Sequence, residues 1–480
     1  KAMKMFKRKG GCLVELGVQS LDKGVLRKIK REMPPDAVKK AVRIIKKAGL
    51  KLGVQVMLGL PGDTLEKSIA TAEKLIKLKP ETARIYPTLV IKGTELARQY
   101  KKGIYKPLTP EEAIEQSSTI LDIFEKRGIK VIRIGLHPSK DLDSKSAMIA
   151  GPYHHAFGEM TRARSMRNKI LDAVKDRYVA NRSHIEIHAP RKKFNLISGH
   201  KGREKRFLEE YFKVPVLLRS NNILQAKSRR YNITVKDVRK DIALIDPRMP
   251  KAAKEKLKKM NYYLAEVPLH KKLPKPIKGH VDMMFFKTKD LNIYEPSLEN
   301  IAKLLRQNGH KCVKGSSIKP NKYPKDILYN ACSIGKHIIH YHGKIEKKIK
   351  EIKANHIPVA QGYTKCSIIP VDNKHIITSD PGVKKEWEKR GGKALLISPG
   401  YIKLPGYKTG LIGGATGVTG KAIFFVGTLS KHPDGSAMRE FIKKAEKSVI
   451  ELYKGPLYDT GTIFLFEAKP RTVLKVFLGM

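Results

Sequence analysis

Residues 331–351 read ACSIGKHIIHYHGKIEKKIKE, which predicts a strand, a turn, a second strand and then a helix. The same order of elements recurs in residues 279–305, 365–389 and 413–444. Residues 457–467 repeat only the beginning of this unit, whereas residues 241–267 predict a strand, a helix and a strand with no hairpin before them. The two ends of the repeat region therefore complete each other, which makes five units.

A repeated unit that cannot bury its own apolar face has to stack on its neighbours. Five ββαβ units that follow one another head to tail predict a closed ring, a five-bladed α/β propeller around a central channel, over residues 236–480. The alignment of the units places one residue of each near the channel, at equivalent positions: Asp282, Asn330, Cys366, Gly414 and Asp459.

The N-terminal part of the chain alternates predicted strands and helices. Strands are predicted at residues 12–18, 52–58, 83–91 and 130–136. Helices are predicted between them, and one begins at Pro110, where the missing backbone N–H costs nothing. Crossovers of this length predict a parallel sheet covered by helices over residues 1–137. The pattern is less regular over residues 138–235, which we interpret as a small α+β extension.

The composition is strongly basic. Lys and Arg number 98 and Asp and Glu number 45, so the formal net charge is +53. Such a field attracts phosphate backbones whatever the fold. Two interpretations stay open: a solvated, lysine-rich surface, and a surface that binds RNA. Nothing in the sequence indicates DNA sequence specificity.

The composition also excludes several classes of protein. Hydrophobic residues make up 41% of the chain, which is too many for a wholly disordered protein. No stretch reaches the roughly 18–20 consecutive apolar residues of a membrane-spanning helix, so no membrane partner is predicted. Four cysteines without a CxxC pair favour a reducing, cytoplasmic location. Because the chain begins at Lys1, close to a predicted interior strand, we expect a further N-terminal part to precede it.

Four separated motifs occur in a fixed order in the N-terminal part: VELGVQSLDKGVL (14–26), QVMLGLPGDT (55–64), IYPTLVIKGTEL (85–96) and YKKGIYKPLT (100–109). Together they resemble the C-terminal half of radical S-adenosylmethionine (radical SAM) enzymes, in the subgroup similar to the elongator catalytic subunit. The resemblance implies a partial (βα) radical SAM barrel that binds S-adenosylmethionine at the carboxyl ends of its strands. It also implies the residues near this cofactor: Glu15, Gln19, Gly59, Gly62 and Tyr86.

The chain departs from this family in its cysteines. The family holds a [4Fe–4S] cluster on the three thiolates of a CxxxCxxC run, and the 480 residues contain no such run. We therefore expect a [4Fe–4S] cluster only if a missing N-terminal part supplies the ligands. The other interpretation is that the half-barrel is a relic, so enzymatic activity stays open.

The repeat region carries motifs of a second family, among them GHVDMMFF (279–286), QGYTKCSIIPV (361–371), SKHPD (430–434) and GPLYDTGTIFLF (455–466). They resemble the guanidine-modifying enzymes, whose fold is a five-bladed α/β propeller, and look closest to a clostridial domain family of unknown function with that fold. In those enzymes a cysteine attacks the guanidinium carbon, a histidine moves protons and carboxylates hold the cation.

The resemblance implies Cys366 as the nucleophile, with His432 as its base. The predicted substrate-binding residues are Asp282, Asn330, Asp434 and Asp459. The nucleophile of this superfamily normally lies in the last unit, where this chain has Thr460-Gly461-Thr462. A buried core cysteine therefore stays an alternative for Cys366. No metal site is predicted.

Three hypotheses of function follow. The first is a radical SAM-type protein that modifies RNA and carries a propeller domain of unknown activity. The second is a propeller hydrolase or transferase that uses Cys366 on a guanidino compound or another cationic small molecule. The third is a non-catalytic binding module, which the unusual position of Cys366 favours.

Overall fold

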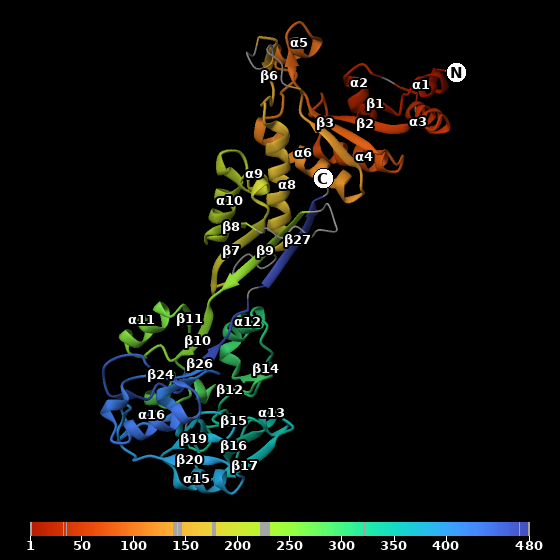
Figure 1. Ribbon diagram of the computed structural model, residues 1–480. Helices are drawn as coiled ribbons and strands as arrows, with labels where there is room; N and C mark the ends of the chain where they lie inside the picture. The colour runs from red at the N-terminus through yellow and green to blue at the C-terminus, as the bar shows by residue number, and fades with distance from the viewer. Residues whose placement is uncertain are drawn as a thin grey trace. The chain divides into compact units, whose positions relative to one another are not determined.

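The computed structural model of the protein describes residues 2–31, 33–34, 36–137, 142, 146–174, 179–220, 231–319, 323–469 and 471–478. Two compact units are present (Figure 1). Unit 1 comprises Lys1–Arg177, Ile185–Lys236 and Thr472–Met480, and unit 2 comprises Tyr178–His184 and Asp237–Arg471. Across the residues that the structure describes, no helix combines the length and the hydrophobicity that crossing a membrane requires.

Unit 1 contains a parallel sheet with the strand order β1-β2-β3-β5. Its strands are β1 (Leu13–Gln19), β2 (Lys51–Leu58), β3 (Thr82–Pro87) and β5 (Lys130–Ile134). The helices between them are α2 (Lys23–Lys28), α3 (Ala37–Lys47), α4 (Leu65–Ile76), α5 (Glu95–Lys101) and α6 (Pro110–Lys126). The predicted parallel sheet is confirmed, as is the start of α6 at Pro110, where Thr109 and Glu112 form a capping box.

The two faces of this sheet differ because side chains alternate along each strand. One face is apolar and packs with α3, α4 and α6 into a buried core that includes Leu52, Val54, Val56, Ala83 and Ile85. The other face carries the charged and amide side chains of the same strands. An amphipathic sheet of this kind leaves a polar surface available for a ligand.

The rest of unit 1 is a mixture of helices and strands. The remaining helices that bear on its packing are α1 (Ala2–Arg8), α8 (Phe157–Ala173), α9 (Phe194–Ser198) and α10 (Arg203–Phe212). A short antiparallel pair joins β4 (Val90–Ile91) and β6 (Met148–Ala150). A four-stranded sheet has the order β27-β9-β7-β8, with β7 (Arg182–Ala189), β8 (Val216–Ser220), β9 (Tyr231–Arg239) and β27 (Arg471–Leu478). The C-terminal strand is thus added to a sheet formed by residues far upstream.

Among the described residues, unit 2 contains five three-stranded sheets, each with one antiparallel and one parallel pair. Four of them are each formed by three strands that are consecutive in sequence. The first has β12 (Phe285–Lys287), β13 (Asn292–Tyr294) and β14 (Cys312–Lys314), and the second has β15 (Cys332–Ile334), β16 (His337–Tyr341) and β17 (Asn355–Val359). The third has β18 (Ile368–Pro370), β19 (His375–Thr378) and β20 (Lys393–Leu396), and the fourth has β22 (Thr416–Val418), β23 (Ala422–Phe425) and β24 (Ser448–Glu451). A helix joins the second and third strand of each: α12 (Glu299–Gln307), α13 (Lys347–Lys350), α15 (Pro381–Glu388) and α16 (Gly435–Lys444). The predicted strand, turn, strand and helix order is confirmed in all four.

The fifth sheet is assembled from both ends of the repeat region. β10 (Asp241–Ile245) and β11 (Tyr262–Glu266) are joined by α11 (Lys251–Lys259) and pair in parallel. β26 (Phe464–Phe466) then pairs antiparallel with β10, so that Ile242 lies opposite Phe466 and Leu244 opposite Phe464. A smaller parallel pair joins β21 (Ile402–Lys403) and β25 (Leu457–Tyr458).

The first strands of the five sheets follow one another around a ring. β12 contacts β15, β15 contacts β18, β18 contacts β22, and β22 contacts β26. The last contact of the ring, between β26 and β12, is aromatic: the ring of Phe285 lies 5.4 Å from that of Phe464 and 5.9 Å from that of Phe466.

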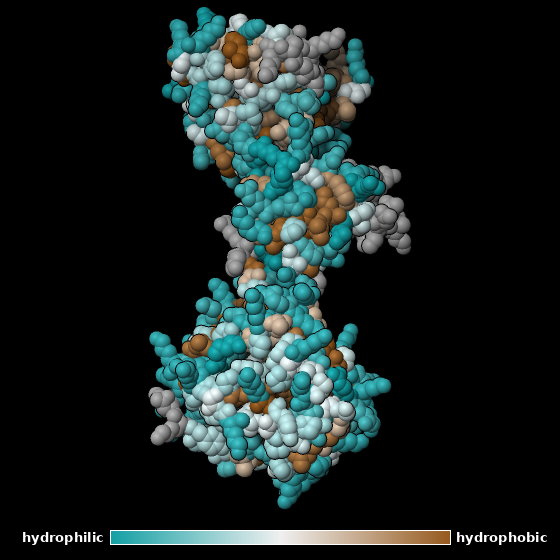
Figure 2. All heavy atoms as spheres, turned by 90° about the vertical axis from the view of Figure 1, so that its left-hand side faces the viewer, coloured by the Kyte–Doolittle hydropathy of each residue, from teal (hydrophilic) through white to brown (hydrophobic). Residues whose placement is uncertain are grey.

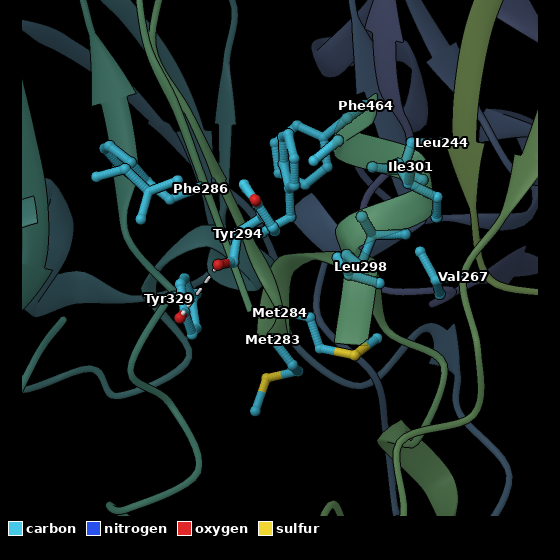
Figure 3. Close-up of a cluster of buried hydrophobic side chains, with 14 of the residues drawn as sticks. Leu244, Val267, Met283, Met284, Phe286, Tyr294, Leu298, Ile301, Tyr329 and Phe464 are labelled. Carbon is cyan, nitrogen blue, oxygen red and sulfur yellow. Dashed lines mark hydrogen bonds between the residues drawn. The ribbon is translucent and has the colours of Figure 1, made fainter. Parts of the chain in front are cut away.

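The largest hydrophobic core of unit 2 lies beside this last contact (Figure 3). Phe286, Tyr294 and Tyr329 are buried there, and the Tyr329 hydroxyl donates to the Tyr294 carbonyl at 3.5 Å. Met283, Met284 and Phe464 extend the same core. Aromatic and methionine side chains from several sheets thus exclude water where the two ends of the repeat region meet.

Arg164 on α8 ties three helices of unit 1 together. Its side chain is 2% exposed and its guanidinium contacts Glu111 at 2.5 Å and Glu115 at 2.6 Å on α6, and Glu204 at 3.3 Å on α10. Glu204 is buried as well, so its carboxylate depends on arginine partners. A buried charge that loses its partner is costly.

We expect Arg164→Met to lower the free energy of unfolding of unit 1 by about 2–4 kcal/mol, because Glu204 would lose a buried cationic partner. Arg203→Met is the matched control: Arg203 also pairs with Glu111, but it is exposed, and an exposed pair contributes less than about 1 kcal/mol. Chemical denaturation of both variants measures the difference. Equal losses for the two variants would show that the buried network does not stabilise these helices.

Candidate functional site

The polar face of the parallel sheet in unit 1 brings together three of the predicted cofactor residues. Glu15 on β1 pairs with Arg84 on β3, with 2.7 Å between Oε1 and Nε. Arg84 also donates to the Tyr86 hydroxyl at 3.4 Å. Gln19, at the end of β1, accepts a hydrogen bond from the Gln55 amide at 3.3 Å. Arg84 and Gln55 were not predicted from the sequence.

Because Gly53 on β2 has no side chain, the Glu15 side chain can cross β2 and reach Arg84 on β3. Glu15, Gly53 and Thr82 are in register on three adjacent strands. A Cβ atom at position 53 would lie 2.7 Å from Cγ of Glu15 and 2.9 Å from the Thr82 hydroxyl. A glycine inside a strand often marks such a close approach, and this was the signal in the sequence.

Gly59 and Gly62 form the turn after β2, at the carboxyl end of that strand. Both have positive φ values, 71° and 79°, which favour glycine. Asp63 holds the turn, since its carboxylate accepts the Gly59 N–H at 3.1 Å and the Ser68 hydroxyl at 2.8 Å. Burial nevertheless raises the pKa of Asp63. The structure gives the two glycines a clear role in the turn, at the strand end where the resemblance places the cofactor.

The donor set of this polar face suits S-adenosylmethionine but not an iron–sulfur cluster. A carboxylate, a guanidinium and two amides can bind the amino-acid part and the cation of such a ligand. A [4Fe–4S] cluster needs cysteine thiolates. Cys12, which is exposed, belongs to unit 1, whereas Cys312, Cys332 and Cys366 belong to unit 2. The cysteines of this chain therefore do not form a cluster site.

The centre of unit 2 brings Cys366, Asp282 and Asn330 into direct contact. The Cys366 thiol donates to Asp282 Oδ2 at 3.1 Å, and the Asn330 amide donates to the Cys366 sulfur at 3.2 Å. The Thr462 hydroxyl donates to the same Asp282 oxygen at 2.7 Å. These four residues, with His280 and Asp459, are called the central cluster below. These six residues come from the segments around the first strands of four different sheets. Four of them, Asp282, Asn330, Cys366 and Asp459, are among those that the repeat alignment placed at equivalent positions.

Asp459 and His280 complete the central cluster. Asp459 accepts the backbone N–H groups of Leu411 at 2.9 Å and Gly461 at 3.0 Å. Its carboxylate fills the space that a side chain at Gly414 would need. His280 Nδ1 lies 3.8 Å from Asp459 Oδ1. Gly414 occupies the repeat position that Asp282, Asn330 and Cys366 occupy in other units. Because it has no side chain, Asp459 can approach closely there.

His280 is a candidate functional residue that the sequence analysis missed. One ligand atom each of His280, Asp282 and Cys366 lies within 4.8 Å of the others, in a group that is wholly buried. Nitrogen, carboxylate and thiolate ligands are those of a zinc site. The available signal was its position two residues before Asp282; in the structure His280 directly precedes the short 3-10 helix Val281–Met283 that carries Asp282.

The electrostatics of the central cluster oppose a thiolate. Burial raises the pKa of Cys366 well above its usual range, and the neighbouring carboxylates of Asp282 and Asp459 raise it further. Burial also raises the pKa of Asp282, and that of Asp459 to about 6. Burial lowers the pKa of His280. Near neutral pH the thiol is therefore protonated, whereas a cysteine nucleophile reacts as the thiolate.

His432 and Asp434 make their contacts elsewhere in unit 2. The Asp434 N–H donates to His432 Nδ1 at 3.1 Å, and the Asp434 carboxylate accepts the Ser398 N–H at 2.6 Å. The His432 ring lies 5.4 Å from the ring of Tyr401. In the part of the chain that the structure describes, no hydrogen bond joins His432 to Cys366. The structure does not bring this predicted base to the predicted nucleophile.

A small cavity of about 120 Å³ reaches the central cluster at His280 and Asp459. Its remaining lining includes Asp246 and Arg248, whose charged groups pair at 2.6 Å. A space of this size holds a few water molecules or an ion rather than a drug-sized ligand. In this conformation the central cluster is therefore closed to large substrates on this side.

Known families match separate parts of the chain. The Radical SAM superfamily matches residues 1–75, and the Radical_SAM C-terminal domain matches residues 80–169. Residues 244–464 match a family of unknown function, DUF6873. The first two matches lie in unit 1 and the third in unit 2.

Relatives of known name match the N-terminal part. The tRNA uridine(34) acetyltransferase of Methanocaldococcus jannaschii is 38% identical over 120 residues, which are 24% of this chain and 22% of the relative. Elongator complex protein 3 of Homo sapiens is 34% identical over 115 residues, 23% of this chain and 21% of the relative. A solved structure of Methanocaldococcus infernus Elp3 with an N-terminal deletion is 30% identical and covers 35% of this chain and 39% of its own, with a TM-score of 0.31.

The chain spans about a fifth of the length of the two curated relatives named above. The family matches and the parallel sheet support a partial radical SAM barrel in unit 1. Residues 1–169 are thus similar to a radical SAM segment of the elongator type, and residues 244–464 are similar to a family whose activity is unknown.

Proposed function

We propose that unit 1 binds S-adenosylmethionine on the polar face of its parallel sheet and belongs to a protein that modifies RNA. The observation that carries the proposal is the Glu15–Arg84 ion pair on that face, with the amides of Gln19 and Gln55 beside it. Parallel sheets bind ligands at the carboxyl ends of their strands. The named tRNA uridine(34) acetyltransferase supports RNA as the substrate class.

The residues of this face have separable roles in the proposal. Glu15 accepts hydrogen bonds from the ammonium of the ligand and attracts its sulfonium, and Arg84 holds the Glu15 carboxylate in place. Gln19 and Gln55 orient each other through the hydrogen bond from Gln55 Nε2 to Gln19 Oε1, and in the proposal the Gln55 carbonyl oxygen and the Gln19 NH2 group bind the ligand. S-adenosylmethionine, when bound, supplies the methyl sulfonium group on which the chemistry of radical SAM enzymes depends.

We expect Arg84→Gln to weaken S-adenosylmethionine binding by about tenfold, because Glu15 would lose the partner that orients it. Isothermal titration of S-adenosylmethionine into the 480-residue chain measures the affinity. Arg43→Gln, an exposed arginine on α3, is the matched control and should leave the affinity unchanged within about twofold. Absence of saturable binding, or equal losses in both variants, would contradict the proposed cofactor site.

RNA binding is the second part of the proposal, and the net charge of +53 supports it. Figure 2 shows hydrophilic side chains over most of one face, with isolated hydrophobic patches between them. We expect binding to a tRNA transcript to weaken at least tenfold between about 50 and 200 mM salt, with little preference over a shuffled sequence. Affinities unchanged across this range would contradict electrostatic binding, and no binding at low salt would leave a solvated basic surface.

For unit 2 we propose an α/β propeller whose centre binds a small molecule without a thiolate nucleophile. The five sheets, with their first strands in a ring, support the propeller. The raised pKa of the Cys366 thiol favours binding over hydrolysis or transfer at this cysteine. The next experiment also tests the alternative hypothesis, a hydrolase or transferase that acts on a guanidino compound through Cys366.

We expect iodoacetamide at neutral pH to label Cys12, which is exposed, and to leave Cys366 unlabelled until the protein unfolds. Cys366→Ser should destabilise unit 2 by about 1–2 kcal/mol, since it changes a buried site. Mass spectrometry of labelled peptides and thermal unfolding measure the two effects, with Cys12→Ser as the control variant. Labelling of Cys366 in the native protein at a rate similar to that of Cys12 would contradict this proposal and support the hydrolase or transferase hypothesis.

A further inference from the structure

A second and larger cavity of unit 2, of about 620 Å³, lies among the turns of the repeated sheets. It is lined by the turn between the first and second strand of four sheets: Thr288–Lys289, Gly335–Lys336, Asp372–Asn373 and Thr419–Gly420. The fifth sheet contributes Phe464 and Leu465 of β26, together with Ile463 directly before that strand. This space, called the hairpin cavity below, is therefore built by every sheet of the ring.

The hairpin cavity is strongly basic. Its lining includes five lysines: Lys287, Lys289, Lys336, Lys365 and Lys447. Asp372 is the acidic residue among its lining residues, and its carboxylate is already engaged. It lies 2.8 Å from His375 Nδ1 and accepts the Lys374 N–H at 2.7 Å. Asp372 also attracts the Lys447 ammonium. Five lysines against one carboxylate still give the lining an excess of positive charge.

Lys365 is buried and Lys287 is partly buried, which the basic composition of the surface does not explain. Lys365 is 7% exposed, and its ammonium contacts the Thr462 hydroxyl at 3.3 Å. Lys287 donates to the Leu465 carbonyl and lies 4.3 Å from the centre of the Phe466 ring. Lysine is rarely buried unless a partner compensates its charge.

The ammonium groups of Lys287, Lys365 and Lys447 contact neutral oxygens. Lys447, for example, donates to the Thr419 carbonyl at 2.7 Å. Within the described residues, no carboxylate lies within 4.0 Å of these three groups. Burial lowers the pKa of Lys287 to about 8 and also lowers that of Lys447. An ammonium has three donors, so each retains capacity for an anion that would offset its desolvation.

We propose that the hairpin cavity binds a small molecule that carries two or more phosphate groups. Its volume is in the range of small-molecule sites and too small for an RNA helix. Several separate ammonium groups match several phosphate oxygens, since lysine binds phosphate as a point charge. The cavity repels the guanidino cations expected from the sequence, so it is a site of a different ligand class.

A chain of contacts joins the hairpin cavity to the central cluster. The Lys365 ammonium contacts the Thr462 hydroxyl, and that hydroxyl donates to Asp282, which also accepts a hydrogen bond from the Cys366 thiol. Lys365 and Thr462 both line the cavity. An anion bound to Lys365 therefore lies one hydroxyl away from the buried carboxylate.

Titration calorimetry with inorganic tripolyphosphate tests the proposal on the 480-residue chain at about 150 mM salt. We expect one saturable site per chain. The double variant Lys336→Gln/Lys447→Gln should weaken binding at least tenfold, because both lysines line the cavity. The matched control is Lys385→Gln/Lys443→Gln, which removes the same charge from exposed positions on α15 and α16 and should change the affinity less than about twofold.

Lys365→Met provides a second variant that probes the buried part of the cavity, with thermal unfolding as the check on folding. It should weaken tripolyphosphate binding at least tenfold in protein that still unfolds cooperatively. Losses of equal size in the exposed control variant would overturn the proposal and assign the binding to the overall charge of the chain. Absence of saturable binding, or competition by arginine, would overturn it as well.

Discussion

The pairing of β26 with β10 is the constraint on which unit 2 depends. These strands lie more than 200 residues apart in sequence, yet Leu244 is opposite Phe464 and Ile242 opposite Phe466. Without this pairing the fifth sheet has no first strand, and the ring of inner strands stays open between β22 and β12. The aromatic contacts of Phe285 then lose their partners. A sheet edge that stays unpaired is also exposed to association with other chains.

Closure has an electrostatic consequence at the centre of unit 2. The segments around the inner strands converge, and with them Asp282 and Asp459 are buried beside Cys366. Two carboxylates near a buried thiol keep the proton on sulfur, so the arrangement works against a nucleophile. The same closure assembles the hairpin cavity from the turns of the sheets, and there the charges are ammonium groups. The same ring of sheets therefore places carboxylic acids at its centre and lysine ammonium groups in the hairpin cavity.

Unit 1 separates its polar and apolar side chains by strand alternation. Val54 and Ile85 are buried under the helices, whereas Glu15 and Arg84 pair on the other face. In an isolated sheet such an ion pair contributes little to stability. The pair lies in the first half of β1 and β3, where Gln55 on β2 is in register with Arg84. The family matches of this part support the proposal that this polar face binds a ligand.

The sequence by itself determined the helices, strands and repeated units, because strand alternation, helix caps and repeats depend on residues that are close together in the chain. It predicted the start of α6 at Pro110 and the repeated unit of residues 331–351. It did not reveal that His280 joins Asp282 and Cys366, or that His432 lies with Tyr401 instead. Those neighbours depend on strand register and on closure of the ring, which join residues far apart in the chain. The tertiary structure alone decided the charge around each of them, because burial and distance set a pKa, and neither can be read from the order of residues.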